Sequence, residues 1–440
     1  MLLPVTPTAR PSASTPAIPA LDRALGLGSV TISGIGIIVG AGIYVLIGPA
    51  AAVAGSGVWI SFLLAGVMCA FTALSYAELA SMFPRAGAEY EYASHVFSPR
   101  VSFVIGWFMA VGLIIATAAV ALGFGNYLSA LSGMTPTLSA ALLIITLGAI
   151  CLTGIRFSAA IMVTLSIIEV AGLVAVMIAG APVIQVGRLV GELKGVSGLL
   201  GGVGLVFFAF IGFDEVNTLA EETVNPARTI PRALLLALAI STFLYVGVAV
   251  TAVGVLGPTT LSTSTTPLAD VIKAVSGPTG ATVLSYIALA ATANTALLAL
   301  TAASRLQFGM AEEGALPRWM MSVGPRSKAP RATIITGVLG ALAFVLIGDI
   351  SVVAGVTDLA VLLVLLAVNV CVIVLRRRAP RAPRPFRSPW TVRGIPLLAV
   401  LGIFSVLCVL PTLSLRVWTL GAIVLLIGLG THEITRRSSP

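Results

Sequence analysis

The feature that most constrains this chain is a succession of apolar runs, each long enough to cross a membrane. A helix needs roughly 20 apolar residues to span the hydrocarbon core. Candidate runs lie near residues 28–54, 57–82, 100–130, 136–154, 157–180, 198–221, 232–256, 280–310, 331–348, 351–375, 395–412 and 415–432. Only 9% of the residues are charged, whereas a soluble protein carries about 25%. The sequence therefore predicts an all-α membrane protein with about twelve transmembrane helices.

The basic residues are distributed unevenly between the two sides that these runs imply. Of the 25 Lys and Arg residues, 21 fall on the side of the chain ends, and the four exceptions are Arg188, Lys194, Lys273 and Arg416. Short loops rich in Lys and Arg stay in the cytoplasm, so both termini are expected there. The bias toward Ala, Gly, Val and Arg is typical of GC-rich bacterial genomes. A multi-pass protein of the bacterial cell membrane is the expected product.

The net charge of +9 raises the question of a nucleic-acid partner. The basic residues, however, are spread along successive cytoplasmic loops and helix ends instead of being gathered on one folded domain. Such a distribution favours contact with anionic lipid at the cytoplasmic face, and no nucleic-acid partner is expected.

Two of the apolar runs carry dense glycine at their middles. The glycines are Gly34, Gly36, Gly40 and Gly42 in the first run, and Gly201, Gly202, Gly204 and Gly212 in the sixth. Glycine lets the backbone leave helical dihedral angles, although small residues in membrane helices also serve as packing faces. The first and sixth helices correspond to each other if ten helices form two inverted five-helix repeats. We therefore expect two interrupted helices.

An unwound segment at bilayer depth exposes backbone groups that lipid cannot satisfy, so it must line a cavity or hold a ligand. The half-helix that begins near Gly42 would present N–H groups and a positive dipole end to a carboxylate. Carbonyl groups released around Phe208, Ala209 and Ile211 would accept hydrogen bonds from an ammonium group. The expected substrate is consequently a small-molecule amino acid, recognised mainly by backbone.

Four stretches follow recognisable patterns of Gly, Pro and charged residues, at residues 34–44, 76–90, 208–233 and 304–317. In this order they resemble GIGxxIGxGIF, YAELAxxxPxAGGxY, FxAFxGFD with EExxNPxxxIPxA, and SRxxxxMAxDGxLP. These are motifs of the amino acid-polyamine-organocation transporters, and among them of bacterial relatives of the cationic amino acid transporters. The matches cover about residues 25–330 in the order of the family.

The resemblance implies a LeuT-type fold of two inverted five-helix repeats plus two peripheral helices, with substrate between helices one, three, six and eight. The implied segments are a disordered cytoplasmic tail (1–24), a transporter core (25–376, with repeats over about 25–180 and 198–376), a basic cytoplasmic loop (377–394), two peripheral helices (395–432) and a cytoplasmic tail (433–440). The implied substrate-binding residues are Ile38, Gly40, Ala41, Gly42, Phe208, Ala209, Phe210 and Ile211.

The third helix departs from the family pattern in a way that bears on the substrate. Close bacterial relatives of the cationic transporters carry a Glu shortly after a Gly-Trp pair, whereas Gly106-Trp107 is followed here only by apolar residues and glycine. Burying an unpaired Lys or Arg side chain costs several kcal/mol. This favours small neutral or apolar amino acids, with a polyamine, organocation or cationic amino acid exchanger as the alternative.

A second departure lies in the fifth helix, where some relatives carry a Lys that occupies the space of a bound sodium ion. Glu169 stands at the matching position. An intramembrane acid is a functional hypothesis by default, although a protonated Glu can also serve structure alone. Thr292 and Thr295 on the eighth helix could face Glu169 or simply satisfy neighbouring helices. The hypothesis is coupling to H⁺, with no other cofactor and no metal site.

Other charged residues suggest a gate and further proton sites. Asp214, after the proposed break in the sixth helix, could cap the lower half-helix or take part in coupling. Asp358 in the tenth helix is either a hydrogen-bonded structural acid or an accessory proton site. The candidates for a cytoplasmic gate, which could also be merely solvated helix ends, are Arg85, Glu221, Glu222 and Arg228.

Functions of other classes are less well supported. An intramembrane enzyme would need a nucleophile, base or metal constellation, and a channel would need rings of polar residues; the sequence offers neither. A membrane sensor that binds a solute without transporting it remains as the alternative of another class. The sequence predicts no particular oligomeric state.

Overall fold

The computed structural model describes residues 25–83, 88–154, 159–324, 327 and 329–438, and this part of the chain is almost entirely helical. The α-helices are α1 (Leu27–Ile38), α2 (Gly42–Ala54), α3 (Val58–Met82), α4 (Ala88–Ser94), α5 (Pro99–Ser132), α6 (Pro136–Thr153), α7 (Ala159–Gly180), α8 (Gly195–Val206), α9 (Pro226–Leu256), α10 (Pro258–Thr263), α11 (Pro267–Glu312), α12 (Arg331–Val345), α13 (Ile350–Arg378), α14 (Leu397–Val409) and α15 (Leu415–Ser438).

Short 3₁₀ helices and one small hairpin complete the described fold. The 3₁₀ helices are η1 (Ala181–Val183), η2 (Val186–Leu189), η3 (Phe207–Phe210), η4 (Phe213–Glu222), η5 (Arg318–Met321) and η6 (Leu410–Thr412). The strands β1 (Thr391–Val392) and β2 (Ile395–Pro396) pair antiparallel, with Thr391 opposite Pro396.

Most of the helices are long and apolar enough to cross a membrane. In the described residues nine helices pass this test, and the bent pair of α1 and α2 makes a tenth span. Two further apolar segments, α12 and Leu397–Thr412, are shorter. The prediction of an all-α membrane protein is confirmed, whereas the count of twelve spans and the inverted repeat stay predictions.

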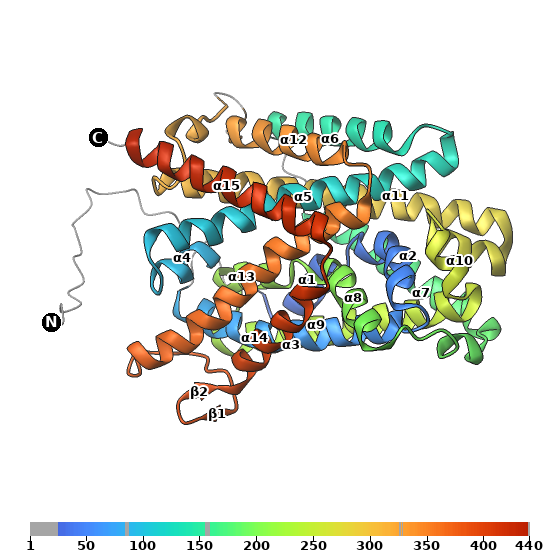
Figure 1. Cartoon of the computed structure of the whole chain (residues 1–440), viewed down its shortest axis with the longest axis horizontal. Helices are drawn as coiled ribbons and strands as arrows, with labels where there is room; N and C mark the ends of the chain where they lie inside the picture. The colour runs from blue at the N-terminus through green and yellow to red at the C-terminus, as the bar shows by residue number, and fades with distance from the viewer. Residues whose placement is uncertain (1–24, 84–87, 155–158, 325–326, 328, 439–440) are drawn as a thin grey trace.

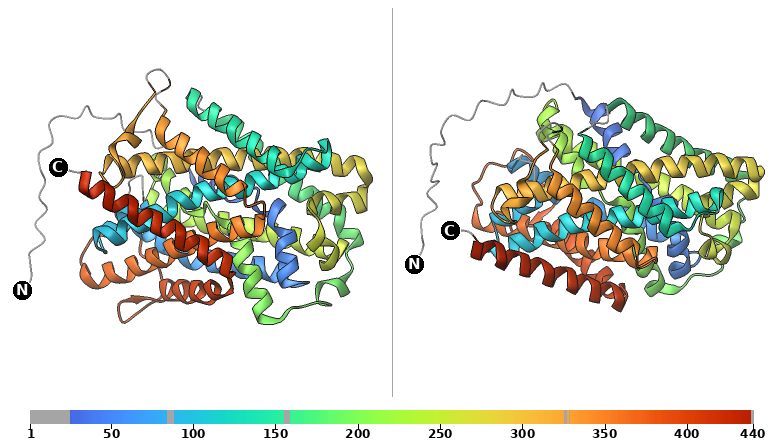
Figure 2. Two further views of the ribbon diagram at one scale, coloured as in Figure 1. Left: turned by 45° about the horizontal axis from the view of Figure 1, so that its top comes forward. Right: turned by 90° about the horizontal axis from the view of Figure 1, so that it is seen from above.

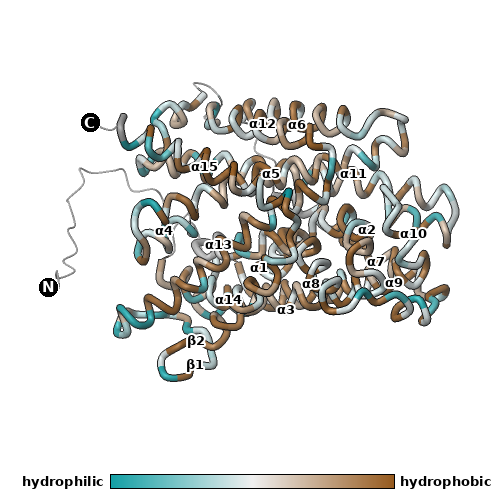
Figure 3. Tube along the Cα trace, in the orientation of Figure 1, coloured by the Kyte–Doolittle hydropathy of each residue, from teal (hydrophilic) through white to brown (hydrophobic). Residues whose placement is uncertain are grey.

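The long helices lie side by side as a bundle, with α5 at its centre. Helix α5 packs against α6, α11, α12 and α13, while α3 and α1 both pack against α9 (Figure 1, Figure 2). Helix α4 and the C-terminal ends of α13 and α15 gather at one end of the bundle, and α10 lies at the other. Hydrophilic residues concentrate toward these two ends and hydrophobic residues between them (Figure 3), as expected for a bundle that spans a membrane.

Proline and glycine set several helix boundaries. Helices α5, α6 and α9 begin at Pro99, Pro136 and Pro226, where the missing N–H costs nothing because the first turn has no intrahelical acceptor for it. The residues that follow α5 and α6 are Gly133 and Gly154, which adopt left-handed φ angles of 76° and 73°. Left-handed residues close a helix by satisfying its last carbonyl groups.

Helix α11 is longer than the apolar run predicted over residues 280–310. It includes a kink at Gly277, where φ is 77° and ψ is −174°. The segment before this kink carries the charged residues Asp270 and Lys273 and precedes the apolar run in the sequence. Hydrophobicity alone therefore did not predict that this segment is helical.

Candidate functional site

The first span is interrupted near its middle. Helix α1 ends at Ile38 and α2 begins at Gly42, and the two axes are bent by 50°. Val39 leaves the helix with a ψ of 98°. The interruption predicted from the glycines of this run is therefore present. It leaves the Ile38 carbonyl and the Ala41 N–H to pair with other helices, while the Val39 N–H and the Ala41 carbonyl keep helical hydrogen bonds.

The sixth span is interrupted as well, but not at its densest glycines. Helix α8 runs through Gly201, Gly202 and Gly204, and the chain leaves helical geometry only after η3, at Ile211 (ψ 135°) and Gly212 (φ +104°). A positive φ of this kind suits glycine because it has no Cβ.

The glycines inside α8 serve packing instead. A Cβ on Gly202 would lie 2.5 Å from Ser61 Oγ of α3, so the absence of a side chain lets α8 and α3 approach closely. The two roles of glycine that the sequence left open thus apply to different glycines of the same span.

The two interrupted segments contact each other directly. A Cβ built on Gly42 would lie 2.5 Å from the Cα of Ala209 and 2.7 Å from its Cβ. These distances leave no room for any side chain at position 42. The N-terminus of α2 and the η3 segment therefore meet backbone against backbone, which brings together the two sets of residues predicted to bind substrate.

Tyr245 of α9 joins the two interruptions. Its fully buried hydroxyl oxygen lies 2.7 Å from the carbonyl oxygen of Ile38 and 2.8 Å from that of Ala209. The ring packs edge-on against Phe210 at a centroid distance of 5.1 Å, and it is tilted by 52° against Phe62 at 5.7 Å. One hydroxyl proton is thus shared between two carbonyl groups that the helix breaks have released. Tyr245 was not predicted from the sequence, although it is the only Tyr in the apolar run at 232–256.

Thr295 of α11 supports the first interruption from another side. The Ala41 N–H donates to Thr295 Oγ1 at 3.1 Å, and a Cβ on Gly40 would lie 3.1 Å from the same oxygen. Thr292, in contrast, donates its hydroxyl within its own helix, to Ala288 O at 2.7 Å. Of the two threonines predicted to aid coupling, Thr295 reaches the interrupted helix, whereas the hydroxyl of Thr292 serves α11.

Most of the predicted substrate-binding residues are buried. Gly40 and Ile211 are half-buried, and the buried ones are Ile38, Ala41, Gly42, Phe208, Ala209 and Phe210. The Phe208 carbonyl accepts a hydrogen bond from the Ile211 N–H at 3.2 Å. Because a carbonyl oxygen has two lone pairs, the Phe208 carbonyl could accept a second hydrogen bond from a bound ammonium group.

Glu169 lies on α7, against the first span. It is 1% exposed, and its Oε1 has no hydrogen-bond partner in the part of the chain that the structure describes. Its backbone carbonyl accepts from the Tyr44 hydroxyl at 2.9 Å, and the carboxyl lies close enough to Tyr44 and Tyr245 to interact electrostatically with both. One turn away, the Ser166 hydroxyl donates to Gly36 O at 3.4 Å. The acid is therefore buried beside the interrupted helix, where the coupling hypothesis needs it.

Asp214 meets a second acid that sequence analysis did not assign to the site. Asp214 follows Gly212 in η4, and its buried carboxyl accepts a hydrogen bond from that of Glu89 in α4. Burial, and then the negative charge of Asp214, raise the pKa of Glu89 to about 8. A raised pKa means that Glu89 holds its proton near neutral pH. The pair links α4 to the second interrupted span.

The predicted gate is only partly visible. Arg85 and the side chains of Glu221 and Glu222 lie outside the described residues, and Arg228 is exposed on α9. The gate of these four residues stays a prediction.

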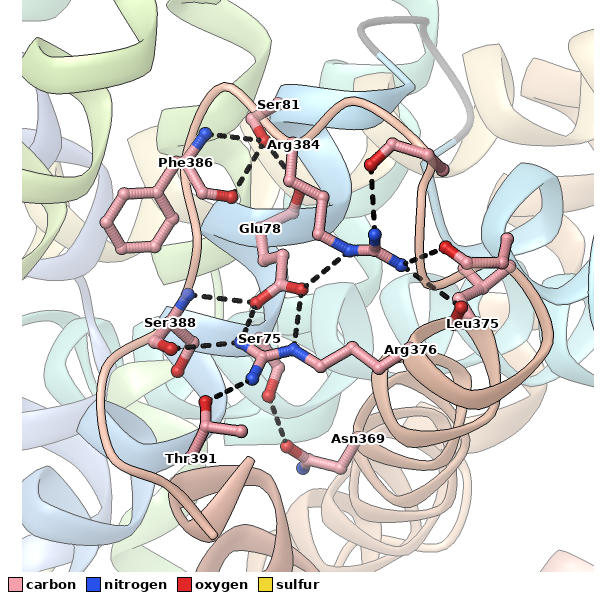
Figure 4. A network of polar contacts seen from close by, with 12 residues as sticks. Ser75, Glu78, Ser81, Asn369, Leu375, Arg376, Arg384, Phe386, Ser388 and Thr391 are labelled. Atoms are coloured by element: carbon pink, nitrogen blue, oxygen red, sulfur yellow. Dashed lines mark hydrogen bonds and ion pairs between the residues drawn. The ribbon is translucent and has the colours of Figure 1, made fainter. Parts of the chain in front are cut away.

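A buried ion-pair network that the sequence did not predict lies near the end of the bundle occupied by α4 (Figure 4). Arg376, at the end of α13, donates from Nε to Glu78 Oε1 of α3 at 2.9 Å, and Arg384 Nε lies 3.3 Å from the same oxygen. The Ser388 N–H donates to Glu78 Oε2 at 2.9 Å. This network holds α13 and the segment after it against α3. The acid in the 76–90 motif and the Arg-rich end of α13 were the signals available in the sequence.

Comparison with known proteins adds independent findings. The family model described as amino acid permease matches residues 25–431. The chain is 32% identical to a branched-chain amino acid permease of Bacillus subtilis, over 97% of this chain and 95% of that protein. It is 30% identical to a methylthioribose transporter of the same organism, over 86% of each. It is 31% identical to the vacuolar cationic amino acid transporter 4 of Arabidopsis thaliana, over 82% of this chain and 64% of that protein.

Replacing Glu78 by Gln is expected to destabilise the protein by about 3–5 kcal/mol, because two buried Arg side chains would lose their counter-ion. Glu433→Gln is the matched control, since Glu433 forms an exposed pair with Arg100 at 3.7 Å, and such pairs contribute under about 1 kcal/mol. Unfolding of the two purified variants in detergent measures the difference. Equal loss of stability in both would contradict the assigned role of the buried network.

Proposed function

Because the chain belongs to the amino acid permease family, we propose that it is a secondary active transporter for small neutral or apolar amino acids, driven by H⁺. The observation that carries this proposal is the direct contact of two interrupted helices at Gly42 and Ala209. Irregular backbone inside an apolar bundle is tolerated where it is buried in protein or lines a cavity. Paired interruptions at corresponding helices mark the substrate sites of many secondary transporters.

The two ends of an amino acid would bind to different interrupted helices. The N-terminus of α2 offers N–H groups and a positive dipole end, which suit a carboxylate. The carbonyl groups of Ile38 and Ala209, which share the Tyr245 hydroxyl, suit an ammonium group. Alternating access would follow if α1 and α2 change their angle while this site holds the substrate.

Two observations support a neutral side chain on the substrate. The residues at the interruptions are apolar, with Phe208, Phe210 and Ile38 buried among them. Helix α5 offers no acid after Trp107, because the next residues are Phe108, Met109, Ala110, Val111 and Gly112. The relative named as a branched-chain amino acid permease agrees with this preference. The relative named as a cationic amino acid transporter favours the second candidate, a cationic amino acid or polyamine exchanger.

Glu169 is the proposed carrier of the coupled proton. A protonated carboxyl would fill the space between α1, α7 and α11, and would steady the interrupted helix in its binding shape. When the site opens to water, the carboxyl can release the proton, since hydration favours the charged form. Alternating access would thereby load the proton on one side and unload it on the other.

The proposed setting is a bacterial cell membrane, with both termini and the basic loops in the cytoplasm. The support is the placement of 21 of 25 Lys and Arg residues on one side, together with the general rule that such loops stay inside. Anionic lipid at the cytoplasmic face would contact these residues.

The substrate preference can be tested by competition in proteoliposomes. We expect Leu, Val, Ile or Ala to inhibit uptake of a labelled branched-chain amino acid at concentrations at least about tenfold lower than Lys, Arg or putrescine. A tenfold ratio corresponds to about 1.4 kcal/mol, well below the cost of burying an unpaired ammonium. Stronger competition by Lys or putrescine would favour the second candidate, and binding without uptake would favour the sensor.

The coupling hypothesis can be tested with Glu169→Gln, which mimics the protonated acid. This variant is expected to keep substrate counterflow at equal pH but to lose accumulation driven by an inward proton gradient. Glu192→Gln is the control, because Glu192 is an exposed acid whose Oε2 accepts from the Thr259 hydroxyl. Gradient-driven accumulation by Glu169→Gln at the wild-type level would rule out the role, and a strict sodium requirement in the parent protein would reassign the site.

A further inference from the structure

A second buried acid, Asp358 of α13, lacks the partners that a structural carboxyl normally has. It is 0% exposed, and neither Oδ1 nor Oδ2 has a hydrogen-bond partner in the described residues. Asp349, at the start of the same helix, accepts from the N–H groups of Ser351 and Val352. Of the two interpretations that the sequence left open for Asp358, the hydrogen-bonded structural acid finds no support in this geometry.

Asp358 lies on the face of α13 that packs against α3. Asp358 precedes Asn369 by three helical turns, so both share one face of α13. Asn369 Nδ2 donates to Thr72 Oγ1 of α3 at 3.0 Å, and its Oδ1 accepts from Ser75 Oγ at 2.7 Å. Cys69, also on α3, lies close enough to Asp358 to interact with it electrostatically. Since α13 also contacts η3, Asp358 belongs to the layer directly beside the second interrupted span.

The chemistry around Asp358 suits a proton better than a metal cation. Hard cations in proteins take about six or more oxygen ligands, and the described residues contain no group of three or more His, Cys, Asp or Glu side chains that could hold a metal. The adjacent Thr357 donates its hydroxyl to Val353 O within α13. A lone carboxyl among apolar groups needs only one proton to become neutral.

We propose that Asp358 is a second proton-binding site, which takes up H⁺ to form a neutral carboxylic acid when α13 is packed on α3 and releases it when that interface is hydrated. The consequence of this inference for transport rests on the proposed function. One more proton would move with each substrate than Glu169 alone would carry. The binding of the proton itself does not depend on transport.

Few other titratable groups stand near this site. Those on the elements packed against this half of α13 are Cys69 of α3, Cys408 of α14 and Arg416 of α15, and Asp214 of η4 lies close enough to Cys69 to interact with it electrostatically. Helix α8 and η3 carry none, and α5 has only Arg100 and Tyr127 near its ends. A protonation signal that changes when Asp358 is substituted can therefore be assigned to Asp358 and not to these neighbouring groups.

The test is infrared difference spectroscopy of the full-length protein in lipid, between acid and alkaline buffers, without substrate. We expect a carboxylic acid C=O band that disappears on alkalinisation in the wild type, is missing in Asp358→Asn, and persists in the control Asp349→Asn. If Asp358→Asn does not fold, Asp358→Glu retains the titratable group and should shift the band. Identical bands in the wild type and in either Asp358 variant would overturn the proposal.

Transport then tests the consequence separately. In proteoliposomes the number of protons moved per substrate is expected to fall by about one in Asp358→Asn and to stay unchanged in Asp349→Asn; an unchanged number in Asp358→Asn would contradict the coupling role. Failure of the wild type to accumulate any amino acid would reject the proposed function, while the infrared result would still decide whether Asp358 binds a proton.

Discussion

The structure depends on one constraint, which is that backbone groups released by a helix break inside an apolar bundle must find partners within the protein. An unsatisfied buried N–H or C=O group costs about 1–3 kcal/mol, and lipid offers no compensation. At the two breaks the partners are few and specific. The Tyr245 hydroxyl serves Ile38 O and Ala209 O, and Thr295 serves the Ala41 N–H. Helices α9 and α11 thereby hold the interrupted segments in register, and these are the groups that we propose to bind a zwitterionic substrate.

Three acids of the interior, Glu78, Glu169 and Asp358, differ in how they meet the same constraint. Glu78 has full charge compensation from Arg376 and Arg384, so it acts as a fixed structural anchor. Glu169 and Asp358 have oxygens without partners in the described part of the chain, and these are the two acids that we propose as proton-binding sites. Such carboxyls respond to hydration of their surroundings, and a transporter that alternates between two open states supplies that change.

The sequence alone predicted the membrane class, the two interrupted spans and the burial of Glu169, because these depend on local composition and on a family pattern. It placed the second break around Phe208 to Ile211, where the chain does leave helical geometry. It did not show that Gly201, Gly202 and Gly204 stay inside α8, since glycine is flexible in principle and the close approach to α3 at Gly202 is a tertiary contact. Contacts between distant segments were also missed. Glu78 and Arg376 are separated by 298 positions, and Tyr245 reaches two breaks from a third helix. Such pairings depend on the tertiary arrangement, which no single segment encodes.

The central claim is that the backbone contact between α2 and η3 forms the substrate site. Its most direct test is substrate binding by Gly42→Ala, whose added Cβ would lie 2.5 Å from Ala209 Cα, compared with Gly28→Ala, where nothing lies within 4 Å. Both purified proteins should be monodisperse, and a branched-chain amino acid should raise the thermal unfolding midpoint of Gly28→Ala as it does that of the wild type. The account predicts that this stabilisation is lost in Gly42→Ala. Wild-type affinity in a well-folded Gly42→Ala protein would contradict it.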